Sequence, residues 1–157
     1  MQWRTERRST SITANKDNPV GGNPMSTAPA ARTPGATRAG PGDYLFDLGT
    51  VETIMGGPAY STAHGPCVEG DRMIVGLMRM PAGTGAEPHS HPNEQWIYVL
   101  EGTFRGTVGG KPVEATPGSV LYIPADTIHS GGATADADLI FFTVKDASYG
   151  LHGIKAG

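Results

Sequence analysis

Apolar residues in this chain come in short runs, each bounded by glycine, proline or charged residues. The runs are 44–48, 51–55, 73–80, 95–100, 104–108, 112–115, 119–123 and 138–144. Each run has the length of a β-strand and is too short for a typical helix. The 23 glycines and 13 prolines favour tight turns, and Gly109-Gly110 is a hairpin signal. The pattern predicts an all-β chain that closes into a barrel or a sandwich.

This strand pattern starts only after residue 42. Residues 1–42 are rich in Ser, Thr, Ala, Gly and Pro and have no apolar periodicity, which predicts a disordered tail. The tail has six basic and two acidic residues, scattered as in a solvated segment rather than clustered as in a nucleic-acid-binding arm. Met25 offers a second plausible start, which leaves open whether residues 1–24 belong to the natural protein. We expect one folded domain, residues 43–157.

Three features that the sequence lacks limit where the protein is expected to be located and what it is expected to bind. Cys67 is the single cysteine, so no intrachain disulfide can form. No apolar run approaches the ~20 residues that cross a bilayer. The net charge of −3 provides no basic field for nucleic acid. We expect a cytoplasmic protein that binds a small molecule rather than a membrane or a nucleic acid.

Two histidines separated by one residue carry the strongest chemical signal. Residues two apart on a strand point to the same side, so His89 and His91 can present both imidazoles to one point. Imidazole is a common ligand of divalent transition metals. A surface pair is the alternative interpretation of His-x-His alone. A second segment, in which a glycine turn leads through a buried strand to Pro124 and His129, favours the metal site.

Together the two segments resemble the paired motifs of the cupin superfamily, over roughly residues 70–145. The matching positions are Gly83, His89, His91, position 95 and Gly102 in the first motif, and Gly118, Pro124 and His129 in the second. The resemblance implies a double-stranded β-helix, also called a jelly-roll barrel. It also implies one divalent transition metal (Fe, Mn, Ni, Cu or Zn). The implied ligands are His89, His91, Gln95 and His129.

The chain departs from the family pattern at the fourth ligand. Position 95 is Gln where the family usually has Glu, so the ligand set is neutral and leaves the +2 charge of the metal uncompensated. That charge favours direct binding of an anionic substrate. Glu94 is an alternative carboxylate ligand, although it lies on the opposite face of the strand from Gln95. In the second motif, Asp126 and Ala133 replace a Gly and an Asn of the family pattern.

Other groups must move protons and hold the substrate. Tyr98 and Tyr122 are candidate catalytic residues, with core packing as the alternative. Arg79 and Arg105 could bind a substrate carboxylate through paired N–H donors, with a surface position as the alternative. The glycine-flanked run 145–153, which includes His152, is expected to be a surface tail.

Three functions are compatible with these features. The first is a metal-dependent dioxygenase acting on a small apolar or aromatic enolisable compound, because apolar strands suit an apolar pocket. The second is a metal-dependent isomerase or lyase on a small acid, such as a sugar acid, which the Gln ligand favours. The third is a ligand-binding cupin without catalysis. Strands that are apolar on both faces, such as 95–100, also predict a homodimer.

Overall fold

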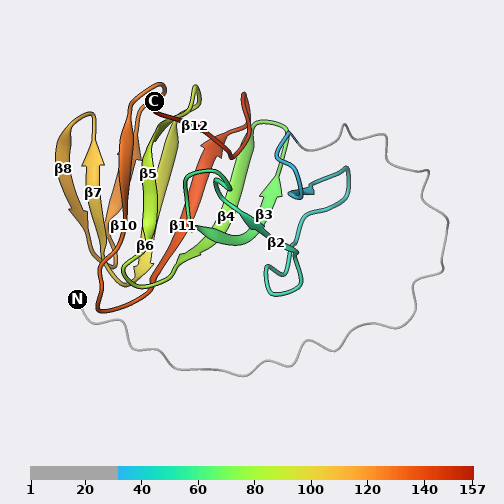
Figure 1. The fold of residues 1–157 in the computed structure, drawn as a ribbon. Helices are drawn as coiled ribbons and strands as arrows, with labels where there is room; N and C mark the ends of the chain where they lie inside the picture. Colours follow the sequence, from blue (N-terminus) through green and yellow to red (C-terminus); the bar gives the residue numbers. More distant parts are fainter. Residues whose placement is uncertain (1–31) are drawn as a thin grey trace.

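The computed structural model describes residues 32–157. All the secondary-structure elements in that range are β-strands (Figure 1). The strands are β1 (Thr37–Arg38), β2 (Thr53–Met55), β3 (His64–Glu69), β4 (Met73–Met80), β5 (Gly85–Ser90), β6 (Gln95–Glu101), β7 (Phe104–Val108), β8 (Lys111–Ala115), β9 (Val120–Ile123), β10 (His129–Ala133), β11 (Leu139–Asp146) and β12 (Ile154–Lys155). No helix in this range could span a membrane.

The strands form two sheets that enclose one core. The larger sheet has the order β1-β3-β4-β11-β6-β9, with β2 paired to β3, and the smaller has the order β12-β5-β10-β7-β8. Only the short β1 pairs in parallel with its neighbour among the strands described. The predicted all-β jelly-roll barrel is therefore confirmed.

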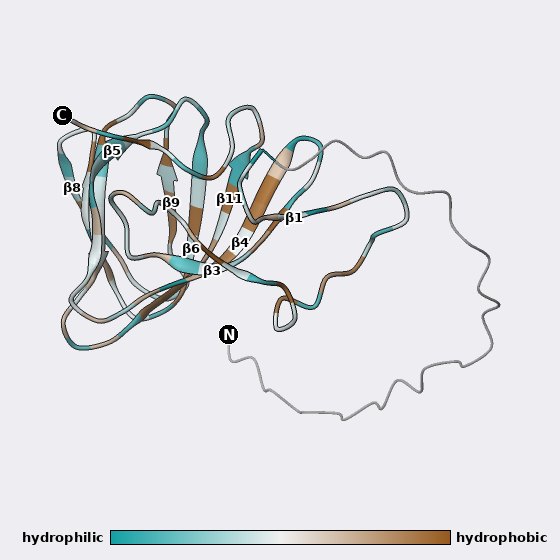
Figure 2. Ribbon diagram, turned by 45° about the vertical axis from the view of Figure 1, so that its right-hand side comes forward, coloured by the Kyte–Doolittle hydropathy of each residue, from teal (hydrophilic) through white to brown (hydrophobic). Residues whose placement is uncertain are grey.

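Alternation along the strands decides which side chains face the interior. In β6, Ile97 and Val99 are buried, whereas Trp96, Tyr98 and Leu100 are more than two-fifths exposed. Hydrophobic residues make up most of β4, and part of this strand is brown in Figure 2. The interior of the barrel is therefore largely apolar, and the buried polar residues include His89, His91, His129, Thr143 and Lys145.

Most of the predicted strands exist, and one does not. The run 44–48 is a loop in which Tyr44 and Leu45 are 94% and 92% exposed. The strands β3, β5 and β10 were not predicted, because they are built largely from glycine, proline and histidine. A Cβ on Gly132 of β10 would lie 2.1 Å from the carbonyl oxygen of Thr84. Close approach of two strands therefore explains why this strand lacks the usual β-branched residues.

The hairpin between β7 and β8 follows the prediction. Gly109 and Gly110 connect the two strands with φ angles of 57° and 76°. Two consecutive positive φ values characterise the tight primed turn that matches the twist of a hairpin. Glycine is the residue that adopts this backbone conformation without steric strain.

Both ends of the described chain pack on the barrel. The backbone N–H groups of Arg32 and Thr33 donate to the buried carboxylate of Glu69 at 2.6 and 3.0 Å. The barrel therefore begins before residue 43, while residues 1–31 of the predicted tail lie outside the described range. The run 145–153 is not a surface tail, because Leu151 is buried and β12 adds to the edge of β5.

Candidate metal centre

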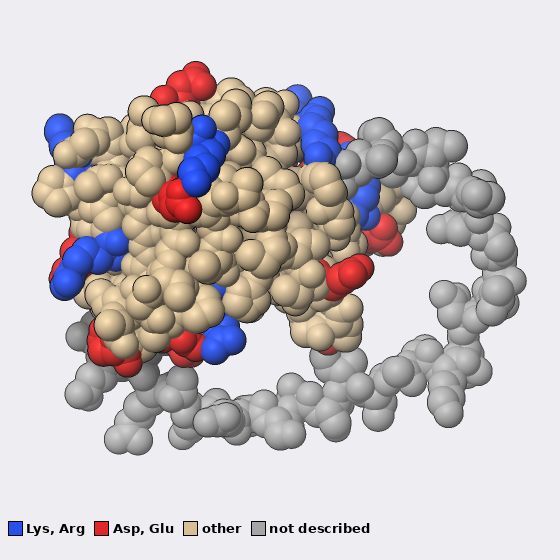
Figure 3. Space-filling view, in the orientation of Figure 1, with Lys and Arg blue, Asp and Glu red and all other residues tan. Residues whose placement is uncertain are grey.

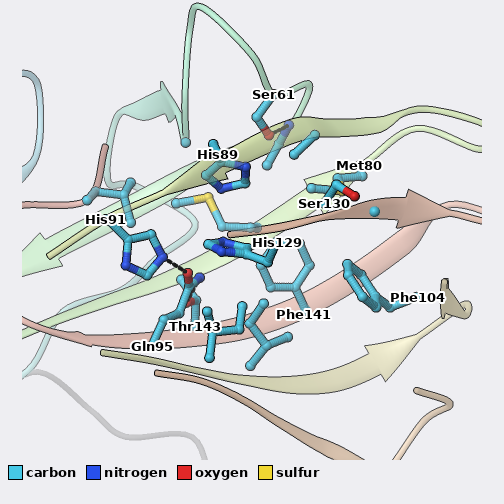
Figure 4. Close-up of a pocket in the computed structure, with 18 of the residues that line it drawn as sticks. Ser61, Met80, His89, His91, Gln95, Phe104, His129, Ser130, Phe141 and Thr143 are labelled. Atoms are coloured by element: carbon cyan, nitrogen blue, oxygen red, sulfur yellow. Dashed lines mark hydrogen bonds between the residues drawn. The ribbon is translucent and has the colours of Figure 1, made fainter. Parts of the chain in front are cut away.

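Three histidines meet between the two sheets. His89 in β5 pairs in register with His129, the first residue of β10, so hydrogen-bonded neighbouring strands bring these two rings together. His91 follows directly after the end of β5. The ring centroids are 4.1 Å apart for His89 and His129, 4.9 Å for His91 and His129, and 6.2 Å for His89 and His91. The rings form one buried cluster, with at most 8% of any of the three residues exposed (Figure 4).

Each imidazole is held through its Nδ1 atom by a backbone carbonyl two residues away. Because a carbonyl only accepts, Nδ1 carries the hydrogen in all three rings. Nε2 is then the atom with the lone pair in each neutral ring, and metal-binding histidines are commonly oriented in this way. The Nδ1–O distances are 2.7 Å from His89 to Glu87, 2.5 Å from His91 to Asn93 and 2.8 Å from His129 to Thr127.

Gln95, the first residue of β6, reaches the cluster from the larger sheet. Its Nε2 donates to the hydroxyl oxygen of Thr143 at 2.8 Å, and that hydroxyl donates to the carbonyl of Trp96. The amide oxygen of Gln95 therefore faces Nε2 of His91, at 3.0 Å (Figure 4). Both atoms are acceptors when His91 is neutral, so this contact is favourable only with a cation shared between them.

The pKa values disfavour a proton as that cation. Burial lowers the pKa of His91 to about 4, and the nearby charge of Lys145 lowers it further. Burial, followed by the influence of His129, lowers the pKa of His89 to about 4. Burial also lowers the pKa of His129. At neutral pH the imidazoles are therefore uncharged, which is the form that binds metal.

The donor set suits a divalent transition metal. Three imidazole nitrogens and one amide oxygen are ligand types that Fe, Ni, Cu and Zn accept, and four protein ligands leave room for a substrate. Among residues 32–157, no three His, Cys, Asp or Glu side chains have donor atoms already placed around an ion.

A cavity of about 60 Å³ adjoins the cluster. One water molecule needs roughly 10–15 Å³ of such space, so the cavity has room for several water-sized groups and suits a small ligand. Its wall is mainly apolar, with Phe104 and Phe141 among the larger side chains. It also includes the buried Lys145, and the lining contains no Asp or Glu. The cavity therefore has no negative charge of its own.

Comparison with known proteins agrees with this architecture. Residues 76–145 match the family described as Cupin domain. These residues are a cupin domain. The cupin is 31% identical over 83 residues to dimethylsulfoniopropionate lyase DddW of Ruegeria pomeroyi, which covers 53% of each chain. The match thus spans about half the length of that relative.

Solved structures show the same fold. The polyketide cyclase RemF of Streptomyces resistomycificus superimposes with a TM-score of 0.59 at 21% identity, over 67% of this cupin and 80% of RemF. The dimethylsulfoniopropionate (DMSP) lyase DddQ of Ruegeria pomeroyi gives 0.51 at 22% identity, over 59% of this cupin and 46% of DddQ. At these identities the likeness shows the fold alone.

The tyrosines predicted as catalytic lie outside the barrel of this cupin. Tyr98 and Tyr122 are 43% and 41% exposed on the outer face of the larger sheet. The hydroxyl of Tyr122 donates to Glu94 at 3.0 Å, so Glu94 is also outside and does not replace Gln95. Alternation in β6 and β9 places these residues opposite to the inward-facing Gln95 and Ile123.

The predicted arginines are also remote from the cavity. Nε of Arg79 donates to Asp138 at 2.9 Å, and its side chain is 52% exposed. Nε of Arg105 donates to Glu114 at 2.8 Å, and its side chain is 68% exposed. Arg79 is thus a surface residue in an ion pair, and a role in substrate binding is not supported for either arginine.

Sequence reasoning missed three residues of the site, Tyr60, Thr143 and Lys145. Tyr60 stacks on His89 with ring centroids 4.2 Å apart, and its hydroxyl accepts a hydrogen bond from the backbone N–H of Gly153 at 2.6 Å. The alternation in 139–145 could have revealed two of the three, because Thr143 and Lys145 share the parity of the buried Phe141. No signal in the sequence singles out Tyr60.

Proposed function

We propose that this cupin is a metal-dependent enzyme that acts on a small carboxylic acid by lyase-type chemistry without a change of redox state. The observation that carries this proposal is the charge of the cavity. Three neutral imidazoles, one amide and one buried lysine line it, without a carboxylate. A cavity of this charge favours an anionic ligand, and its volume favours a small one. The similarity to a protein named as a lyase supports the same class.

Each group has a distinct task in this proposal. His89, His91, His129 and Gln95 would hold the metal, which would act as a Lewis acid on the substrate carboxylate. Thr143 keeps the amide oxygen of Gln95 directed into the site. The apolar wall keeps water away and strengthens electrostatic interactions inside the cavity. The proposed reaction is elimination across C2 and C3 of a 3-substituted propionate: a base takes the C2 proton, the C2–C3 double bond forms, and the substituent leaves with the electron pair of its bond to C3.

The test is turnover after loading the purified protein anaerobically with Fe(II), Mn(II), Ni(II) or Zn(II). Dimethylsulfoniopropionate and other 3-substituted propionates are incubated with each form, and product alkene protons are followed by NMR. Alkene formation without oxygen is expected with at least one metal. Failure with every metal would contradict the proposal and leave the dioxygenase and the non-catalytic binding protein as candidates.

The contribution of the neutral ligand is tested with Gln95→Glu. A carboxylate at position 95 compensates part of the metal charge, so the variant is expected to bind propionate more weakly than the wild type at equal metal content. Equal affinity for propionate would refute the charge argument.

A dioxygenase is the second candidate, because the wall of the cavity is mainly apolar. Phe104, Phe141 and Ile97 offer contacts to an apolar enolisable compound. The two functions differ in their need for oxygen. Substrate-dependent oxygen uptake by the Fe(II) form, measured with an oxygen electrode, would select the dioxygenase, and turnover under argon would exclude it.

A further inference from the structure

Lys145 is a buried cationic side chain in the wall of the cavity. It faces inward from β11 two positions after Thr143, and it pairs in register with Gln95 of β6. Only 2% of the residue is exposed. Its charge lies close enough to the three histidines to lower the pKa of each, in addition to the effect of burial.

The ammonium group of Lys145 has no carboxylate within ion-pairing distance in the described part of the chain, although the charge of Asp146 attracts it from farther away. Nζ donates one hydrogen bond, to the carbonyl of Leu151 at 2.8 Å. None of the ion pairs among residues 32–157 includes Lys145. The neighbouring carboxylate of Asp146 instead accepts the backbone N–H groups of Glu94 and Ser148. Burial lowers the pKa of Lys145 to about 7, so at neutral pH an anion beside Nζ would stabilise the charged form of the group.

An ammonium group has three N–H donors, and a buried charge without a partner is costly. The arginines that could have served as carboxylate-binding groups lie outside the barrel, whereas Lys145 lines the cavity. The missing partner is therefore an anion that fits a cavity of about 60 Å³. A carboxylate group on a short carbon chain has this charge and size, and its chain suits the apolar wall.

We propose that Lys145 is a substrate-anchoring residue whose ammonium group binds the carboxylate of a short-chain organic acid inside the cavity. This inference rests on the proposed function and adds the group that selects acids over their neutral analogues. The anchor also explains how a wall that is otherwise apolar can orient a small acid. The carboxylate supplies the counter-ion that residues 32–157 do not provide.

The experiment compares propionate with propionamide, which has nearly the same shape but no charge. Binding of each to the Zn(II)-loaded full chain is measured by ligand-observed NMR titration and calorimetry, with metal content determined for every sample. Wild-type protein is expected to prefer propionate. In Lys145→Met and Lys145→Gln the affinity for propionate should fall roughly tenfold to a hundredfold, as expected for loss of a charge-assisted hydrogen bond. Binding of propionamide should change little.

The two variants separate anchoring from a structural role. Gln retains a donor for the carbonyl of Leu151, whereas Met does not. If Lys145→Gln binds propionate as the wild type does, Lys145 only holds the chain near Leu151 and the proposal is overturned. The proposal is also overturned if the wild type does not distinguish propionate from propionamide. Lys111→Met, which removes a charge at an exposed position of β8, is the control and should leave both affinities unchanged.

Failure of the anchor and failure of the proposed function give different results. Loss of the propionate preference in both Lys145 variants, at unchanged metal content and melting temperature, supports the anchor even if no substrate turns over. Conversely, turnover of an acid with wild-type propionate affinity in both variants would support the proposed function and overturn the anchor.

Discussion

Single residues determine whether the histidine cluster can act as a ligand set. The Nδ1 hydrogens of the three rings are held by carbonyl groups of the same chain segments. This arrangement fixes the tautomer, and burial keeps the rings neutral. The cluster therefore offers lone pairs at Nε2 over most of the physiological pH range.

The lowered pKa values predict how metal-free protein responds to acid. Burial lowers the pKa of His89 and His91 to about 4, against an ordinary value of about 6.5 in the unfolded chain. Below pH 6.5 the unfolded state binds protons that the folded state does not, so stability falls from pH 6.5 to about 4. The slope reaches about 1.4 kcal/mol per pH unit for each histidine. Urea unfolding in EDTA at several pH values measures it.

The matched control for this pH dependence is His152→Gln, which lies outside the cluster and should leave the slope unchanged. The double variant His89→Gln/His91→Gln should flatten it. A wild-type stability that is constant between pH 6.5 and 4.5 would show that these rings do not remain neutral in the folded chain.

Asp126 lies in the turn that leads into His129 and has a φ angle of 58°. Its backbone N–H donates to the carbonyl of His91 at 2.8 Å, which links the turn to the cluster. Asp tolerates this left-handed conformation, whereas a β-branched residue does not. Asp126→Val is expected to lower the free energy of unfolding by about 1–2 kcal/mol. Asp126→Gly should retain the wild-type value to within about 1 kcal/mol, and equal stability of the Val and Gly variants would contradict a conformational role for Asp126.

At the residue scale, the sequence predicted the histidines better than their surroundings. The resemblance of the two histidine-bearing segments to the cupin motifs predicted that the rings of His89, His91 and His129 converge. Closeness to the motifs along the chain favoured Tyr98 and Tyr122, although alternation places them on the outer face. Lys145 was missed because its glycine-flanked surroundings suggested a tail.

Secondary-structure elements position the site because side chains alternate between the inner and outer faces of each strand. On β11, Phe141, Thr143 and Lys145 face inward in turn, so one strand supplies an apolar wall, a hydrogen-bond acceptor and a cation. The β5–β10 register places His89 opposite His129. Apolar strands such as β4 were predictable from composition. The two histidine-bearing strands were not, because close strand contacts there require glycine.

The hydrogen bond between β6 and β11 at Gln95 gives a prediction for Thr143. Thr143→Val keeps the shape of the side chain but removes the acceptor that orients the amide of Gln95. Metal affinity should fall roughly tenfold to a hundredfold, as is typical when a group that orients a ligand is lost. Thr143→Ser retains the hydroxyl and should restore most of the affinity. Competition with a chromophoric chelator measures both, and wild-type affinity in the Val variant would refute the role.

The whole molecule presents an apolar patch on the outside of the larger sheet. Trp96, Tyr98, Leu100, Val120 and Tyr122 are each at least 41% exposed there. On the face shown in Figure 3, charged side chains are scattered among uncharged ones rather than gathered into one patch. Exposed apolar surface of this kind is typical of an interface. We therefore predict that the homodimer expected from the sequence forms through this patch.

Light scattering after size-exclusion chromatography tests the dimer. Wild-type protein should elute with twice the mass of the chain, and Tyr98→Glu should elute as a monomer because it buries a charge in the interface. Tyr44→Glu, at a loop position that is 94% exposed, is the matched control and should remain dimeric. A wild-type protein that is monomeric at high micromolar concentration would contradict the predicted homodimer.

The proposed chemistry depends on one divalent ion held jointly by residues of both sheets. The direct test is titration of metal-free protein with Zn(II) against a chelator, for the wild type and for His129→Ala. We predict one tightly bound ion per chain and a loss of at least about a hundredfold in affinity for His129→Ala. His152→Gln should bind as the wild type does. Unchanged affinity in His129→Ala would contradict a metal centre built on the histidine cluster.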